Sequence, residues 1–292
     1  MSTNAIVTQN TLDFSQVTFG DVRLNKAGGK SIPIKYSGQN LQIRLEKTSY
    51  PMGVNIRENE NGTTYTMSLS LRGCDPYAKD RAGGEAGSTG KLYNFLLDLQ
   101  EGVLQHAAKN SKKIFGKDRS LEVLRDTMKS FISPSVEKVN GEWVPTGKYP
   151  PSLKMKVPVY GGDVAMDVTD HMGKRVEIDI DNLASVFPKR CEASIVVSPS
   201  IYVTGTGFGV TWRITYAKVS PPQRTTAADV FRDEIEEEQR GSSAVAATTE
   251  EAAAPYEEES QVQQEEVSVP VTAPAPAPAP ASRRKVKASA AV

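Results

Sequence analysis

Near Ser220 the alternating apolar and polar runs end, and about seventy residues follow: Pro221 and Pro222 break the last strand, 229–239 could form a short charged helix, and from Gly241 on large apolar side chains are almost absent. Such a segment cannot bury enough apolar surface to offset the entropy of ordering, so we expect residues 223–292 to be a disordered tail. The folded body is then limited to roughly 220 residues, which suits one large domain or two small ones. We expect an N-terminal extension over residues 1–30 and a β-rich body over residues 31–222.

The zero net charge of the chain is a cancellation between the body and the tail. Residues 1–223 hold 28 Lys and Arg against 22 Asp and Glu, whereas residues 224–292 hold 7 against 13. The tail carries an acidic stretch (229–266), a Pro-Ala repeat (273–281) and a basic end, namely Arg283, Arg284, Lys285 and Lys287. A basic body tethered to an acidic strand is typical of a polyanion binder whose tail competes for the same groove. The basic end predicts a nuclear localisation signal, a secondary nucleic-acid contact or a solubilising tip.

The chemistry-bearing residues do not favour an enzyme. Two cysteines are too few for a disulfide framework or a four-ligand zinc site, and the two histidines barely enlarge the ligand set. We expect a reducing intracellular compartment and no cofactor. The glycines of 205–209 lie in a hairpin turn between predicted strands, whereas a dinucleotide-binding loop opens a helix. No apolar run is long enough to span a membrane, and the first ten residues do not resemble a secretory signal. We expect a soluble, non-enzymatic protein.

Alternating apolar and polar residues predict strands at both ends of the body. The period-2 pattern is clear in 41–47, in the hairpin 54–57 and 63–71, and in 153–159 and 176–180. A second hairpin is predicted from 194–204 and 208–219, with five side chains on one buried face: Phe208, Val210, Trp212, Ile214 and Tyr216.

Two helices are predicted between these groups of strands, over about 89–132. A glycine-rich basic loop (72–90) leads to a helix capped by Ser88 and Thr89, and a second helix is predicted over 120–132. The two form a helical hairpin that packs on a sheet or barrel or is inserted between its strands. The loop is either functional or a solvated linker.

Cations interleaved with aromatic residues favour single-stranded nucleic acid as the ligand, because cations follow phosphates and aromatic rings stack on bases. Aromatic residues on the apolar strand face, such as Trp212 and Phe208, are predicted to be core. The candidate binding residues are Lys35, Arg44, Lys47, Arg57, Arg72, Tyr77, Lys79, Arg81, Lys154, Lys156 and Arg213.

The order of predicted elements resembles a family of viral proteins. The glycine-rich loop, the helix around 91–97 (KLYNFLL), the strand 153–157 (LKMKV) and the closing strand 208–214 (FGVTWRI) are similar to the single-stranded-DNA-binding proteins of large nucleocytoplasmic DNA viruses, of the African swine fever virus type. The resemblance spans roughly residues 30–220, and the Pro-Ala tail is not part of it. It implies an α+β fold with an OB-like antiparallel β-barrel and an inserted helical hairpin, no cofactor, and DNA contacts at Lys154, Lys156 and Arg213.

These observations predict a non-enzymatic single-stranded-DNA-binding protein of a large DNA virus, acting in replication or genome packaging. RNA is the other nucleic acid that such a surface accepts. The expected further partners are replication or packaging proteins bound by the acidic tail and a second copy of the chain. The expected location is the host nucleus, a viral factory or the virion. The alternative function is a viral structural or scaffold protein whose body binds other proteins.

Overall fold

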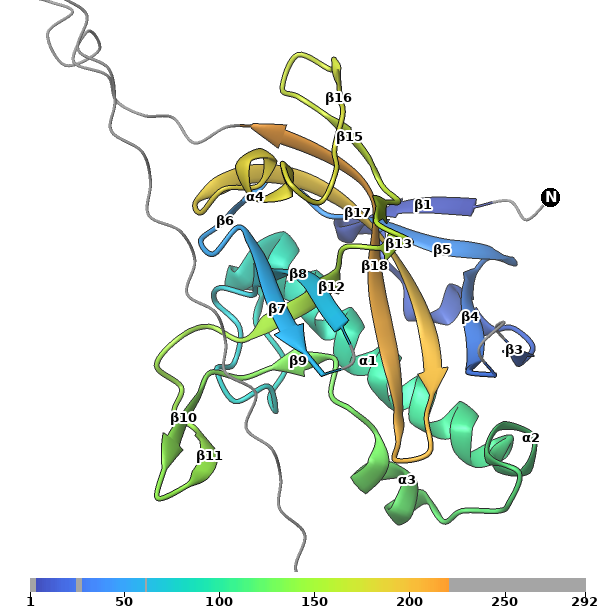
Figure 1. Ribbon diagram of the computed structural model, residues 1–292. Coiled ribbons are helices and arrows are strands. Elements are labelled where there is room, and N and C mark those ends of the chain that lie inside the picture. The colour runs from blue at the N-terminus through green and yellow to red at the C-terminus, as the bar shows by residue number, and fades with distance from the viewer. Residues whose placement is uncertain (1–3, 25–27, 61, 221–292) are drawn as a thin grey trace, which may run out of the picture. The chain divides into compact units, whose positions relative to one another are not determined.

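Two long strands, β17 (Cys191–Val203) and β18 (Phe208–Ser220), form a hairpin that runs through the middle of the sheet (Figure 1). The predicted hairpin is confirmed, and Thr204–Gly207 makes its turn through a hydrogen bond from Thr204 N to the Gly207 carbonyl (2.8 Å). This computed structural model describes residues 4–24, 28–60 and 62–220. The predictions for the acidic stretch, the Pro-Ala repeat and the basic end lie outside these residues.

The main sheet is ordered β1-β5-β4-β17-β18-β12-β8-β7. Most neighbours are antiparallel, but β1 pairs with β5, and β12 pairs with β18, in parallel. No pairing joins β1 to β7 among the described strands, so they form an open sheet and not the closed barrel that the resemblance implied. The strands of this path are β1 (Asn4–Thr8), β4 (Lys30–Tyr36), β5 (Gln39–Arg44), β7 (Val54–Asn59), β8 (Gly62–Ser70) and β12 (Ser152–Lys156).

The period-2 patterns of 63–71 and 153–157 place side chains on the two faces of the sheet as predicted, whereas the strand predicted over 176–180 is wrong beyond Val176, where β16 (Arg175–Val176) ends. In β8, Tyr65, Met67 and Leu69 are buried, and the intervening threonines and serines are not. In β12, Leu153 and Met155 are buried and the two lysines are exposed. The sheet therefore has one apolar face that forms the core and one polar face.

The helix α1 (Gly87–Lys109) covers the apolar face through a stripe of buried side chains that includes Leu92, Leu96 and Leu99. The predicted cap at Ser88 and Thr89 is wrong, because the N-cap is Ala86 and makes no side-chain cap. The Ser88 hydroxyl instead donates to a Glu46 carboxylate oxygen (2.6 Å), tying the start of the helix to the segment after β5.

The second predicted helix is shorter than its pattern suggested. After α2 (Ser111–Phe115), α3 runs only over Leu121–Thr127, where the prediction extended to residue 132. The chain leaves the helix because Lys129 N donates to the Phe208 carbonyl of β18 (2.8 Å), and residues 132–133 then form the strand β9. Pairing with the sheet overrides the helical periodicity here, and Leu121 of the predicted apolar stripe is 39% exposed.

The N-terminal residues belong to the sheet. Residues 4–8 form β1 against β5, and two further strands of this region pair with β4. The remaining elements are η1 (Gln9–Thr11), η2 (Phe14–Gln16), β2 (Val17–Phe19), β3 (Arg23–Leu24), β6 (Thr48–Tyr50), η3 (Gly84–Ala86), β10 (Val136–Val139), β11 (Glu142–Pro145), β13 (Val159–Tyr160), β14 (Asp163–Val164), β15 (Asp167–Thr169), β16 (Arg175–Val176) and α4 (Leu183–Val186).

Candidate nucleic-acid interface

A row of paired residues crosses five strands on the polar face of the sheet. Residues that are directly paired in neighbouring strands point to the same face. From the β7 edge to the middle of the sheet, the row is Asn55 of β7, Thr66 of β8, Lys156 of β12, Arg213 of β18 and Ser198 of β17. None of the five is buried, and the residues on either side of Thr66, Lys156, Arg213 and Ser198 along their strands are buried. The register therefore brings together two cations that are far apart in the sequence.

Two more of the predicted cations lie beside this row. Lys154 is two residues before Lys156 in β12 and pairs with Ser68, and Arg57 is two residues after Asn55 in β7. Both are exposed. Four predicted binding residues, Arg57, Lys154, Lys156 and Arg213, thus share one face of the sheet.

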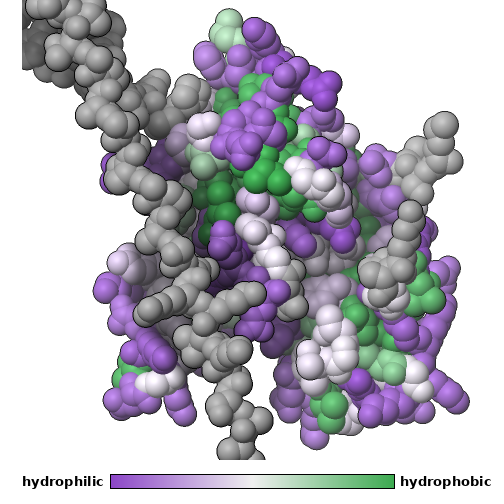
Figure 2. All heavy atoms as spheres, in the orientation of Figure 1, coloured by the Kyte–Doolittle hydropathy of each residue, from purple (hydrophilic) through white to green (hydrophobic). Residues whose placement is uncertain are grey.

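A groove of about 350 Å³ lies between β12 and β18. The two strands share only the Lys156–Arg213 pair, and the groove forms where their pairing is absent. It is lined by Thr64, Thr66, Lys129, Ser130, Phe131, Ser133, Lys154, Lys156, Tyr202, Val210, Thr211 and Trp212. Figure 2 shows hydrophilic residues around a recess in this part of the molecule.

The charge of the groove has one sign. Its lining includes three lysines and no carboxylate. Neither these lysines nor Arg213 forms an ion pair with another residue in the part of the chain that the structure describes. Below the cations, Phe131 and Trp212 meet edge to face with their ring centroids 6.1 Å apart, and both are buried. The groove thus combines unpaired cations and hydroxyl groups with an apolar floor.

Two residues of the groove, Lys129 and Tyr202, were missed by the sequence analysis. Both pack over Gly209, where a Cβ atom would lie 3.0 Å from Tyr202 Oη and 3.2 Å from Lys129 Cβ. Glycine in the interior of a strand is a signal for such a close approach, but the sequence pattern assigns Gly209 to the predicted turn. Tyr202 is half-buried and lines the groove. Burial raises the pKa of its phenol, so this side chain is uncharged at neutral pH.

A bulge in the long hairpin changes which residues reach the polar face. The pairing shifts between Val196 and Val197, because Val196 pairs with Tyr216 whereas Val197 pairs with Ile214. Thr215 is the extra residue, and its hydroxyl donates to the Val196 carbonyl (3.2 Å). The prediction that Tyr216 shares the buried face with Ile214 is therefore wrong: Tyr216 is 43% exposed and Ile214 is 0% exposed.

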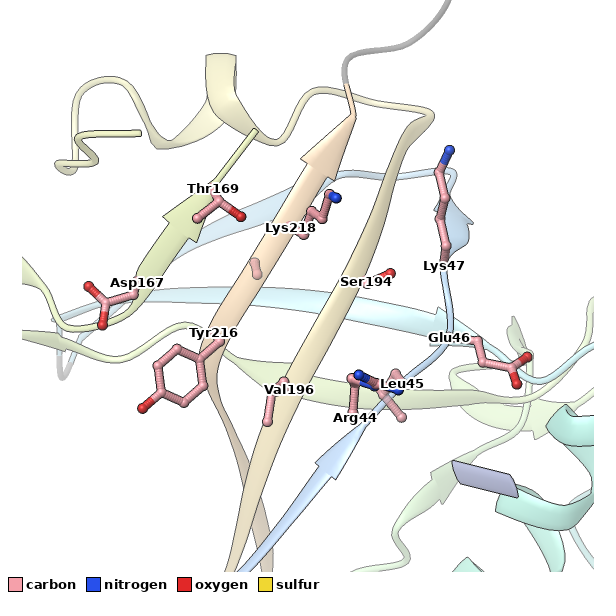
Figure 3. Close-up of a pocket in the computed structure, with 11 residues that line it drawn as sticks. Arg44, Leu45, Glu46, Lys47, Asp167, Thr169, Ser194, Val196, Tyr216 and Lys218 are labelled. Atoms are coloured by element: carbon pink, nitrogen blue, oxygen red, sulfur yellow. The ribbon is translucent and has the colours of Figure 1, made fainter. Parts of the chain in front are cut away.

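The exposed Tyr216 borders a second pocket of about 470 Å³ (Figure 3). Arg44, Lys47 and Lys218 also line it, and the register places Arg44 on the same face as Val196. Unlike the groove, this pocket includes carboxylates, and Lys47 forms an ion pair with Glu192 (2.7 Å). The predicted residues Arg44 and Lys47 thus lie together in a site of mixed charge.

The basic loop is held in place by its own acid and by α1. The Asp75 carboxylate accepts hydrogen bonds from the backbone N–H groups of Asp80 (2.9 Å), Lys79 (2.6 Å) and Tyr77 (3.1 Å), and these bonds lower its pKa. Arg81 forms a bidentate pair with Asp98 of α1 (2.7 and 2.9 Å). The guanidinium of Arg81 is held by this ion pair. The other predicted residues of the loop, Arg72, Tyr77 and Lys79, are exposed, as Arg81 is.

Lys35 lies apart from the groove. It is in β4 and pairs with Thr18 of β2 and Asn40 of β5. The hydrogen bond and charge of Lys113, followed by the charges of Lys35 and Arg23, lower the pKa of Asp21. Lys35 thus contributes to the lowered pKa of Asp21 after Lys113.

The described residues contain no cluster of three or more His, Cys, Asp or Glu side chains that could hold a metal ion. Cys74 and Cys191 are free and buried, and burial raises the pKa of each thiol to about 11. Such thiols are poor nucleophiles at neutral pH because the thiolate is scarce. No helix in the described part of the chain is both long enough and apolar enough to span a bilayer.

Comparisons with known proteins place phage proteins among the structural neighbours. No protein-family model matches the chain, and no curated protein matches it. The chain aligns with the single-stranded DNA-binding protein of bacteriophage Enc34 in complex with ssDNA at a TM-score of 0.34 and 11% identity, over 70% of this chain and 92% of that one. It aligns with gp2.5, a single-stranded DNA-binding protein of bacteriophage T7, at a TM-score of 0.34 and 12% identity, over 66% and 96%. Similarity at this level assigns no function.

Proposed function

We propose that the protein is a non-enzymatic single-stranded-DNA-binding protein and that the groove between β12 and β18 holds the strand. The observation that carries this proposal is the charge of the groove. Three lysines and no carboxylate line it, and Arg213 lies beside it. A cation on a solvated face without an acidic partner contributes little to the stability of the fold. Several such cations on one face attract a polyanion.

The chemistry of the groove suits a single strand better than a duplex. Phosphates bind the ammonium and guanidinium groups, and hydroxyl groups such as those of Thr66 and Thr211 donate to phosphate or sugar oxygens. The half-buried ring of Tyr202 offers a face on which an unpaired base stacks. In a duplex the bases are already stacked on one another and that face has no partner.

The finer parts of the proposal concern the biology of the protein. We propose an OB-like arrangement of the sheet, a viral origin, and a role in replication or genome packaging in the host nucleus, a viral factory or the virion. The acidic stretch would bind replication or packaging proteins or compete with DNA for the groove. A homo-oligomer is part of the same proposal.

Fluorescence anisotropy of a labelled oligonucleotide over a salt series tests the proposed function. Binding of phosphates releases counterions, so the affinity must fall steeply as the salt concentration rises. Absence of binding at low salt refutes the proposal and favours the alternative, a structural or scaffold protein that binds other proteins. A competition series with unlabelled DNA and RNA of the same sequence identifies the preferred nucleic acid.

A further inference from the structure

The hairpin formed by β10 and β11 stands apart from the main sheet. Among the described strands the two pair only with each other, and every residue of both is exposed. Figure 1 shows the hairpin projecting at the lower left, below β9. A two-stranded hairpin alone is marginally stable in water, so one that projects from the body needs a firm base or a ligand.

The base of this hairpin is fixed close to the groove. Ser135 and Thr146 join the two sides through a hydroxyl–hydroxyl hydrogen bond (3.0 Å) and a backbone hydrogen bond from Thr146 N to the Ser135 carbonyl (3.0 Å). Two residues before Ser135, Ser133 lines the groove, and it pairs with Ser152 of β12. With four residues in each strand, the hairpin is about 13 Å long.

The register of the hairpin separates its charges. Lys138 pairs with Trp143, and Glu137 and Glu142 fall on the opposite face. One face therefore carries an exposed aromatic ring and a cation without an acid, and the other carries both carboxylates. Trp143 is 68% exposed, and Lys148 forms an ion pair with Glu137 (3.1 Å), which further reduces the negative charge at the base.

We propose that the face of the hairpin that bears Trp143 and Lys138 is a second contact for single-stranded nucleic acid, in which the indole stacks on a base and the ammonium group binds a phosphate. This inference rests on the proposed function of the groove. Stacking on an indole is independent of sequence, and a cation beside the ring is what the neighbouring phosphate requires. The two acids lie on the opposite face of the hairpin, so a strand bound to this face contacts Lys138 and neither carboxylate.

Intrinsic fluorescence of the full chain tests this contact, because the protein has only two tryptophans and they differ in environment. Trp212 is 3% exposed and Trp143 is 68% exposed, so the solvent-exposed emission belongs to Trp143. Addition of an oligo(dT) of about 30 nucleotides is expected to quench that emission. In anisotropy measurements, Trp143→Ala is expected to weaken binding roughly 5- to 150-fold, and Trp143→Phe is expected to retain most of the affinity because it keeps an aromatic face.

Val144→Ala is the matched control, because Val144 is adjacent, 42% exposed and on the acidic face. It is expected to bind like the wild type. Equal affinities of the wild type and Trp143→Ala, without quenching, overturn this contact while leaving the groove in place. Loss of self-association in Trp143→Ala by sedimentation, with unchanged DNA affinity, also overturns it and identifies the face as a contact between copies. If the wild type binds no oligonucleotide at all, the proposed function itself fails.

Discussion

Replacement of Lys154 and Lys156 by Ala is the most direct perturbation of the groove. Both side chains are exposed, and their backbone pairs with Ser68 and Thr66 do not depend on the ammonium groups. Neither lysine forms an ion pair with a described residue, so no carboxylate is left unpaired by the change. Substitutions at such surface positions change the free energy of unfolding by less than about 0.5 kcal/mol, so we expect an unchanged fold and melting temperature.

The magnitude of the effect on binding comes from counterion release. For single strands, each neutralised phosphate contributes about 0.7 to the slope of log K against log salt. Five cations lie on this face, namely Arg57, Lys129, Lys154, Lys156 and Arg213, and they give a slope of about −3.5 if each binds a phosphate. The double variant is expected to have a slope of about −2.1. The ratio of wild-type to variant affinity then falls about sevenfold between 50 and 200 mM salt.

Anisotropy with a labelled oligo(dT) measures both the affinity and the slope. The matched control is the double variant Lys112→Ala and Lys117→Ala, which removes the same charge from exposed positions in and after α2. This control is expected to keep the wild-type slope apart from the small effect of net charge. A groove variant that binds with the wild-type affinity and slope would refute the reasoning and reduce the two lysines to a solvated strand face.

Two further predictions concern the tail and the pH dependence of stability. Truncation after Gln223 removes residues 229–266, which carry a net charge of −11. A tethered segment reaches about millimolar effective concentration and competes with DNA for the groove, so its removal is expected to tighten DNA binding. The effect is expected to be largest at low salt, where charges are least screened. An affinity ratio of one at low and moderate salt contradicts autoinhibition, and weaker binding assigns the basic end to the site. Burial, followed by the charges of Lys113 and Lys109, lowers the pKa of His106 in the folded protein. The unfolded chain therefore binds a proton at His106 more readily than the folded protein does. The free energy of unfolding is expected to fall as the pH drops below about 6.5. Urea unfolding at pH 7.5 and 5.5 measures this, and His106→Phe, which stays uncharged beside Phe19 (ring centroids 4.6 Å apart in the wild type), should lose that part of the pH dependence.

Local patterns in the sequence were sufficient to predict the strands and their faces wherever the strands are regular. The alternation in 63–71 and 153–157 placed Lys154 and Lys156 outward from the buried Leu153 and Met155, as the structure shows. The spacing of leucines in 92–104 predicted α1, because a helical period of 3.6 is likewise a property of neighbouring residues. The charge difference between the body and the tail required only composition.

Tertiary pairing decided the features that depend on distant residues. The bulge at Thr215 turns Tyr216 outward, and the contact of Lys129 with Phe208 ends α3 five residues before its predicted end. Neither is visible in a local pattern, because each depends on a partner strand and not on the segment itself.

The groove was beyond sequence analysis for the same reason. Its lining comes from residues 64, 66, 129–131, 133, 154, 156, 202 and 210–212, and tertiary pairing brings these segments together. Composition and periodicity determined that the chain has a basic, β-rich body with outward lysines. Strand pairing between residues about 150 apart in the sequence decided which of those cations share one face. The alternation of side chains along a strand is a local property, whereas the choice of its partner strand is not.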